Sequence, residues 1–292
     1  MISGWLILDK PLDITSTKLG NIIRRLLGAK KIGHAGTLDP LATGVLPLAI
    51  GEATKTIPYC VYRKKSYRFQ ITWGENRATE DAEGEVTKVS SVRPERQEIV
   101  AALPQFIGEI SQVPPIYSAV KVDGQRSYAL ARSGQDVVLK SRLVTVYNLS
   151  LLSIDSVDQC TLELECGAGT YVRSIARDLA VMLNTCGYVS ALRRTQTGKF
   201  TEKDTISLEK VYDIAHNIEQ AQSFLPIGAV LDDIPAVPVS EADVVKLRQG
   251  MKIQSDLIFN IGETVAVWQD KQLIAMAYYD EHWLYPKRIF NI

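Results

Sequence analysis

The sequence offers few residues for metal binding or disulfide chemistry. Among its 292 residues are three histidines, which lie far apart at His34, His216 and His282, and four cysteines with no C-x-x-C spacing. This pattern does not predict a zinc site or a disulfide framework. In the segment CTLELEC, Cys160 and Cys166 alternate in phase with two leucines. We therefore expect buried, reduced thiols on the apolar face of a strand.

Long apolar runs are also missing. The longest uncharged stretch, residues 179–192, has 14 residues and contains Asn184, Thr185 and Gly187, so it is too short and too polar for a membrane span. The start, MISGWLILDKP, has no basic residue before its short apolar run and does not resemble a secretory signal. Both features predict a cytoplasmic protein without a membrane span.

A net charge of zero conceals an uneven distribution. Residues 1–75 carry eleven Lys/Arg and five Asp/Glu, whereas residues 200–247 carry three Lys and nine Asp/Glu. Such an asymmetry is typical of a protein that meets phosphate groups on one side, but it also occurs as ordinary surface charge. Charge alone leaves both interpretations open.

Apolar periodicity predicts more strands than helices, with the helices interspersed singly. This pattern favours an α+β fold built on a mixed, largely antiparallel sheet. A helix should begin at Thr15 or Ser16 and end at Gly28, since these are typical capping residues. Further helices are predicted just after Pro94 and over 169–183, and strands over 5–8, 45–50, 66–73, 114–124, 142–154, 160–166 and 188–200.

The amino-acid composition of the chain changes near residue 231. The segment LDDIPAVPVSEAD combines prolines with clustered acids, as linkers and domain edges do. After it come a short helix candidate, VVKLRQG, and three β-rich pieces, ETVAVW, LIAMAYY and HWLYPKRIF. We predict a large domain over 1–231 and a small β-barrel domain over 232–292.

The segment GHAGTLDPLATG, residues 33–44, is the first candidate for chemistry. Asp39 precedes Pro40, so its backbone is biased toward an extended conformation, and the flanking glycines permit tight turns. A carboxylate held there can act as a nucleophile or can cap a turn, and aspartates in turns usually do the latter. The local residues leave both roles open.

The segment CGAGTYVRSIARDLA imitates a dinucleotide-binding turn. Val172 occupies the third glycine position, and no acid follows between Asp178 and Glu202 to hold a ribose, so the motif is weak. Backbone N–H groups at the helix start could still receive an anion. Arg173 and Arg177 lie four apart on one helix face and could equally be solvated or paired with acids.

Several ordered motifs resemble the TruB family of tRNA pseudouridine synthases over the first 230 or so residues. Two departures are visible: Asp13 stands where a glycine is usual, and Ala168 stands where a lysine is frequent. The matching segments are LDKPLDITST (8–17), GHAGTLDPLATGVLPLAIGEATK (33–55), KSYRFQITWGENRATEDAEGEV (65–86), PPIYSAVKVDGQRSYALAR (114–132), CGAGTYVRSIARDLA (166–180) and LRRTQTGKF (192–200).

The resemblance implies an enzyme that isomerises uridine to pseudouridine in the T loop of tRNA, at uridine-55, with no metal and no cofactor. The N1–C1′ bond is cut, the base rotates, and C5 bonds to C1′. Asp39 would be the catalytic nucleophile, attacking either C6 of the base or the sugar. Arg173 would pair with that aspartate, and Tyr67 would stack on the base and help to remove the C5 proton.

The resemblance also implies substrate-binding residues. Leu192 would close the apolar side of the pocket, Tyr171 would contact substrate, and His34 would insert into the folded T loop after base flipping. Lys10 and Lys55 match basic positions near the site, where phosphate contact and surface charge both remain open. Residues 232–292 are placed like an RNA-binding PUA domain, and the protein is expected to act on tRNA as a monomer without a protein partner.

Three other functions fit the sequence less well. A non-catalytic RNA-binding module would not need Asp39, Tyr67 and Arg173 together. A nucleotide-cofactor enzyme using GAGTYV would lack the third glycine and the acid. A relative acting on another RNA, with a guide RNA and partner proteins, is disfavoured by the compact length and short tail.

Overall fold

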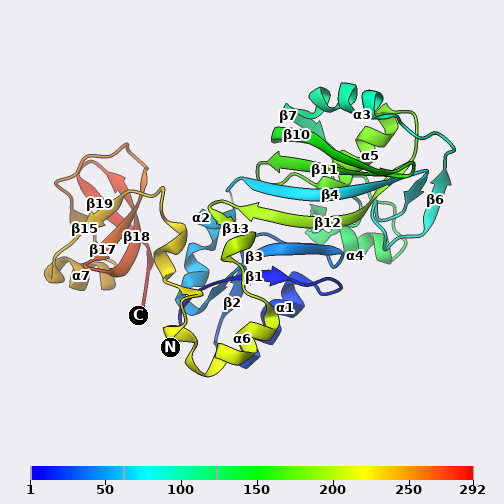
Figure 1. The fold of residues 1–292 in the computed structure, drawn as a ribbon. Helices are drawn as coiled ribbons and strands as arrows, with labels where there is room; N and C mark the ends of the chain where they lie inside the picture. The colour runs from blue at the N-terminus through cyan, green and yellow to red at the C-terminus, as the bar shows by residue number, and fades with distance from the viewer. Residues whose placement is uncertain (1, 62, 123, 292) are drawn as a thin grey trace.

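A ten-stranded sheet forms the larger part of the structure, a computed structural model that describes residues 2–61, 63–122 and 124–291 (Figure 1). The order is β14-β1-β3-β12-β4-β11-β10-β7, with β2 on β3 and β13 on β12. Every pairing is antiparallel except β3 with β12, which confirms the mixed, largely antiparallel sheet. The strands are β1 (Gly4–Lys10), β2 (Ile32–His34), β3 (Ala42–Ile50), β4 (Lys65–Trp73), β7 (Gly108–Gln112), β10 (Arg142–Ser156), β11 (Gln159–Cys166), β12 (Gly187–Thr197), β13 (Phe200–Thr201) and β14 (Phe224–Leu225).

Two longer helices, α1 (Ser16–Leu26) and α5 (Val172–Met182), accompany this sheet. The hydroxyl of Thr15 accepts a hydrogen bond from Lys18 N at 3.1 Å, and Gly28 has a φ of +60° just past the end of α1, as predicted for both caps. The predicted helix near Pro94 begins only at Arg96, because Glu95 and Glu98 form a capping box there. The shorter helices are α2 (Ile57–Val61), α3 (Arg96–Ala102), α4 (Ser127–Arg132) and α6 (Leu208–Ile214).

The apolar faces of these helices and of the sheet share one core. Leu19 of α1 and Ile175 of α5 are fully buried together with Leu8 of β1 and Leu162 of β11. Each such side chain contributes roughly 1.5–3 kcal/mol through burial. The core therefore fixes the sheet and both helices as one scaffold around β4 and β12.

The predicted strand over 114–124 is wrong for most of its length. Residues 114–120 are irregular, with bends over 116–119, and a short hairpin of β8 (Lys121–Val122) and β9 (Gln125–Arg126) follows; Asp123 lies outside the described residues. The carbonyl of Ile116 accepts from Ser127 Oγ, and that of Tyr117 accepts from Arg173. Side chains from other segments therefore take the backbone groups that a strand ladder would use.

A second, five-stranded sheet forms from residue 236 onward, in the order β15-β17-β18-β19-β16. It is curled, as Figure 1 shows in orange and red, which agrees with the expected small β-rich unit. Leu247, Val267 and Leu284 are buried inside it. Its elements are β15 (Ala236–Pro238), α7 (Glu241–Arg248), β16 (Ile253–Gln254), β17 (Thr264–Gln269), β18 (Gln272–Asp280) and β19 (Trp283–Ile289).

The two sheets are joined by a shared apolar cluster. Trp5 and Ala49 of the large sheet pack in it with Met276 of the small sheet and with Phe290, which directly follows β19, all with at most 1% exposure. The proposed division after residue 231 remains a prediction. None of the helices in the described ranges is long and apolar enough to cross a membrane.

The cysteines behave as expected. All four are free and buried, and Cys160 and Cys166 sit on β11 with no exposed area. Within the described part of the chain, no group of three or more His, Cys, Asp or Glu could hold a metal ion.

Candidate active site

The loop that carries Asp39 connects β2 to β3 and is tied down on both sides. Ser16 Oγ donates to the carbonyl of Leu38 at 3.0 Å and accepts from its N–H at 2.9 Å. Lys10 Nζ donates to the carbonyl of Pro40 at 3.2 Å. The backbone immediately before and after Asp39 is therefore fixed by side chains from β1 and α1.

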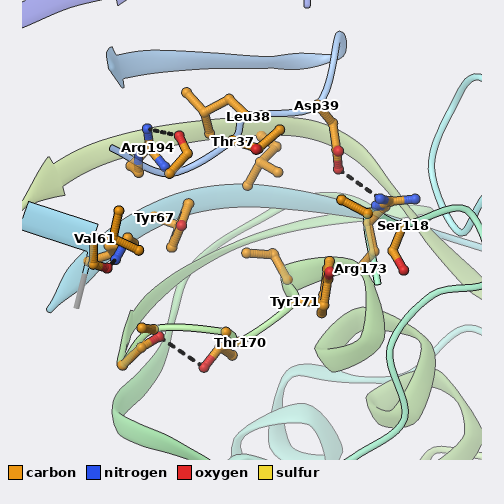
Figure 2. A pocket seen from close by; sticks show the side chains of 18 of the residues that line it. Thr37, Leu38, Asp39, Val61, Tyr67, Ser118, Thr170, Tyr171, Arg173 and Arg194 are labelled. Atoms are coloured by element: carbon orange, nitrogen blue, oxygen red, sulfur yellow. Dashed lines mark hydrogen bonds and ion pairs between the residues drawn. The ribbon is translucent and has the colours of Figure 1, made fainter. Parts of the chain in front are cut away.

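Arg173 connects the Asp39 loop to helix α5 and to the segments that contain Thr79 and Tyr117. It lies in the first turn of α5, and its Nη2 is 2.9 Å from Asp39 Oδ2 (Figure 2). The guanidinium also donates to the carbonyls of Thr79 at 2.8 Å and Tyr117 at 3.0 Å, and it lies 3.5 Å from Asp81. With 4% of its side chain exposed, Arg173 is a buried connector and not a solvated surface arginine.

The environment of Asp39 acts on its pKa in two directions. Burial raises the pKa of Asp39, and the negative charge of Asp81 adds to this rise. Arg173 and Lys10 oppose it, because a nearby cation favours the ionised carboxylate. The side chain of Asp39 nevertheless keeps 35% of its area accessible. It can therefore meet a ligand.

A cavity of about 290 Å³ opens beside this ion pair. Tyr67, Tyr171 and Leu192 line it together with Asp39 and Arg173, so the structure brings five of the eight predicted site residues to one place. The remaining lining residues are Gly36, Thr37, Leu38, Val61, Lys65, Ser118, Ala119, Arg142, Gly167, Ala168, Gly169, Thr170, Val172 and Arg194.

Aromatic and basic side chains shape the walls of the cavity. Tyr67 of β4 is 7% exposed, and burial raises the pKa of its hydroxyl while Arg194 opposes that rise. The ring of Tyr171 carries the guanidinium of Arg142 at 4.9 Å from its centroid. Gln112 fixes the backbone of Tyr171 by accepting from its N–H at 2.8 Å and donating to its carbonyl at 3.1 Å.

Lys10 and His34 lie near the site without being among the residues that line this cavity. Lys10 is fully buried, and burial lowers its pKa to about 8; its Nζ supports the carbonyls of Pro11 and Pro40. His34 of β2 has a buried Nδ1 that finds no hydrogen-bond partner within residues 2–61, 63–122 and 124–291, and burial lowers the pKa of its ring. Both therefore flank the Asp39 loop.

The structure does not bring Lys55 to this cavity. Lys55 lies in the 3-10 helix η1 (Gly51–Thr56), and its Nζ donates to Glu52 Oε2 and to the carbonyl of Ile289 at 2.7 Å. Glu52 in turn accepts from Asn291 N at 2.7 Å. These contacts attach the end of the chain to the large sheet.

Three residues of the site were not found by sequence reasoning. Asp81 is 2% exposed, Lys65 6% and Arg194 1%. The sequence predicts solvated side chains at all three positions, because Asp81 lies in a polar turn, Lys65 at the end of a strand, and Arg194 in a strand with both polar and apolar residues. Their shared signal is burial, which depends on distant segments. Only the order of the motifs relative to Asp39 pointed to these regions.

Comparison with known proteins agrees with this geometry. Residues 24–172 match the family model described as the TruB family pseudouridylate synthase N-terminal domain, and residues 173–236 match the tRNA pseudouridylate synthase B C-terminal domain. These matches define the class of protein as a pseudouridylate synthase, an isomerase.

Relatives and solved structures refine the assignment. The proteins named tRNA pseudouridine synthase B from a Caulobacter species and from Rhodospirillum rubrum are 47% and 48% identical, each over 100% of this chain and 97% of the relative. The chain belongs to the TruB family. Its fold is shared with a chain of "Crystal Structure of a Cbf5-Nop10-Gar1 Complex", at a TM-score of 0.74 and 23% identity over 99% of this chain and 85% of that one.

Proposed function

We propose that this enzyme converts the T-loop uridine of tRNA, uridine-55, to pseudouridine, and that Asp39 is the nucleophile. The observation that carries the proposal is the pairing of Asp39 with Arg173 at 2.9 Å on the edge of a cavity that also contains Tyr67. The tRNA substrate class is supported by full-length relatives named tRNA pseudouridine synthase B.

The reaction needs a carboxylate that stays ionised while a base excludes water from it. In it the N1–C1′ bond breaks, the uracil rotates, C5 bonds to C1′, C5 loses its proton and N1 gains one, and the transient bond to the carboxylate is released. Asp39 forms the transient bond, either to C1′ or to C6, and Arg173 favours its ionised form against the effect of burial. No redox step occurs, since the product is an isomer of the substrate.

The walls of the cavity match the remaining tasks. The buried ring of Tyr67 provides a surface on which the uracil can stack, and its hydroxyl can help to take the C5 proton. Leu192 and Tyr171 close the cavity around the base. Lys10 acts indirectly, because it supports the carbonyl of Pro40 next to the nucleophile.

The cavity can receive a base only after that base has left its stack in the RNA. Flipping costs a few kcal/mol, which phosphate contacts by the basic N-terminal region can offset. We propose that His34 fills the space left in the T loop, and that residues 232–292 act as a PUA-like RNA-binding domain. The enzyme would act on tRNA in the cytoplasm, as a monomer without a protein partner.

The test uses tRNA transcripts labelled with tritium at C5 of uridine. The purified enzyme should release one tritium per tRNA, and carbodiimide mapping should place the product at the T-loop uridine. A matched transcript with cytidine at that position should release none. Product at another position would overturn the T-loop assignment. A fully active Asp39→Asn enzyme would overturn the role of Asp39.

A further inference from the structure

Two buried cations line the cavity without a carboxylate partner in the described part of the chain. Lys65 of β4 is 6% exposed and Arg194 of β12 is 1% exposed. Among the described residues, neither forms an ion pair, whereas Arg173 in the same cavity contacts two carboxylates. Burying a charge without a counter-charge is costly, so the lack of an acid here requires an explanation.

The two side chains converge on one point of the cavity wall. A Cβ placed on Gly36 would lie 3.3 Å from Arg194 Nη1 and 3.5 Å from Lys65 Cε, so both side chains border the bare face of this glycine. Lys65 Nζ donates to the carbonyls of Val61 at 2.6 Å and Arg63 at 2.8 Å, which leaves one of its three N–H donors without an acceptor among the residues that the structure describes.

This cationic corner lies across the cavity from the nucleophile. Figure 2 shows Arg194 and Val61 on one side, the Asp39–Arg173 pair on the other, and Tyr67 between them. The carbonyl of Val61 accepts from Lys65, which places the ammonium group on the Arg194 side. A pyrimidine held between them, with N1 toward Asp39, directs C4 and its oxygen toward this corner, because C4 is opposite N1 in the ring.

The chemistry places negative charge on that oxygen by either route. If Asp39 attacks C1′, the electrons of the N1–C1′ bond stay on the uracil and delocalise onto O2 and O4. If Asp39 attacks C6, the C5=C6 electrons move to C5 and onto O4. In both cases that charge is consumed when C5 bonds to C1′; the C5 proton then leaves, and N1, which has lost its bond to C1′, takes up a proton. Fixed cations in a desolvated site stabilise such developing charge strongly.

We propose that Lys65 and Arg194 form an oxyanion subsite that contacts O4 of the flipped uracil and stabilises its negative charge during the isomerisation. The inference rests on the proposed function, since it requires a uridine in the cavity with Asp39 as nucleophile. Arg194 has a second task, because its Nε and Nη2 hold the carbonyls of Val45 at 2.7 Å and Gly36 at 3.2 Å. Lys65 is therefore the cleaner residue to vary.

The first experiment measures single-turnover rates on a T-arm stem-loop. Lys65→Met should lower the rate by about 10²-fold while the RNA Kd stays unchanged, and its melting temperature should fall because two buried hydrogen bonds, to Val61 and Arg63, are lost. Lys65→Arg should recover most of the rate. The control is Lys64→Met, since the neighbouring Lys64 points to Glu165 at 2.8 Å and is 44% exposed. An unchanged rate in folded Lys65→Met overturns the subsite, and a weakened Kd with an unchanged rate shows phosphate binding instead.

Substrate variants locate the contact. Replacing O4 by sulfur, a weak acceptor, should shrink the rate ratio between wild type and Lys65→Met, whereas replacing O2 should leave the ratio unchanged. This is a double-mutant cycle between one side chain and one substrate atom. Equal ratios for all three substrates overturn the assignment to O4.

The pH profiles of the wild-type enzyme and of Lys65→Arg, which keeps the positive charge, give a third test. Burial and Arg194 lower the pKa of Lys65 to about 8, while the thiols facing it, Cys60 and Cys166, have pKa values raised to about 11. The wild-type rate should fall above pH 8, and Lys65→Arg should extend the plateau. An alkaline limb that persists unchanged in Lys65→Arg does not come from Lys65 and overturns the inference. An inactive wild type contradicts the proposed function itself.

Discussion

Arg173 and Asp39 come from distant parts of the chain and meet at 2.9 Å across the mouth of the cavity. The arginine is already fixed by two backbone carbonyls, those of Thr79 and Tyr117. Its position therefore does not depend on the aspartate, and the pair is preorganised before a substrate arrives.

The first prediction concerns the nucleophile. Asp39→Asn keeps the shape and the loop contacts but removes the negative charge, so turnover should fall by a factor on the order of 10⁴ or more. Tritium release measures this loss. Filter binding should show RNA affinity within about twofold of wild type, because the lost bond forms only during reaction. Asp232→Asn, at a 45% exposed acid, is the control and should retain full activity.

The second prediction concerns the acid limb of the pH–rate profile. Arg173 lowers the pKa of Asp39, so replacing it raises that pKa, and the ionised nucleophile is then lost at a higher pH. In single-turnover measurements, the acid limb of the pH–rate profile of Arg173→Met should lie at a higher pH than that of the wild-type enzyme. Arg177→Met is the matched control, because Arg177 on the same helix pairs with Glu80 at 2.7 Å. A limb unmoved in Arg173→Met would contradict the electrostatic role.

The third prediction compares two glycines with positive φ. A Cβ on Gly44, at φ +99°, would lie 2.2 Å from the carbonyl oxygen of Arg194, whereas one on Gly28, at φ +60°, would meet nothing within 4 Å. Gly44→Ala should therefore lower the free energy of unfolding by about 3 kcal/mol, and Gly28→Ala by about 1 kcal/mol. Urea denaturation measures both, and equal losses would show that strain alone matters.

The fourth prediction separates two roles of Lys55. Its contacts with Glu52 and Ile289 imply that Lys55→Met lowers stability by about 1 kcal/mol and speeds carboxypeptidase attack on the C-terminus. Glu52→Gln should act similarly. A phosphate contact would instead reduce the slope of log K against log salt by about one. A reduced slope with unchanged stability would restore Lys55 to the RNA-binding surface.

Much of the fold could be predicted because its strands are periodic. In β11, Cys160, Leu162, Leu164 and Cys166 are all buried, and their alternation is visible in the sequence. The segment near Tyr117 could not be predicted in the same way. Its carbonyl is taken by Arg173, a partner that local sequence does not reveal.

The residues of the candidate site likewise fall into those that the sequence predicts and those that only the three-dimensional contacts reveal. Local chemistry left Asp39 as a turn cap or a nucleophile, and only the resemblance joined it to Tyr67 and Arg173. The resemblance did not reveal Lys65, whose charge becomes informative only once its burial is known. For Lys55 the resemblance predicted a position near the site, whereas in the structure its side chain contacts Ile289 instead.

The parallel pairing of β3 with β12 sets a limit on what can enter the cavity. The chain leaves the Asp39 loop at Ala42 and pairs at once with Leu192, and Gly44 pairs with Arg194. The loop that carries Asp39 and the cavity wall that carries Arg194 are thus joined directly by the hydrogen bonds between β3 and β12. The pairing of β3 with β12 therefore fixes the distance between Asp39 and the opposite wall of the cavity, so the width of the cavity is a property of the sheet itself.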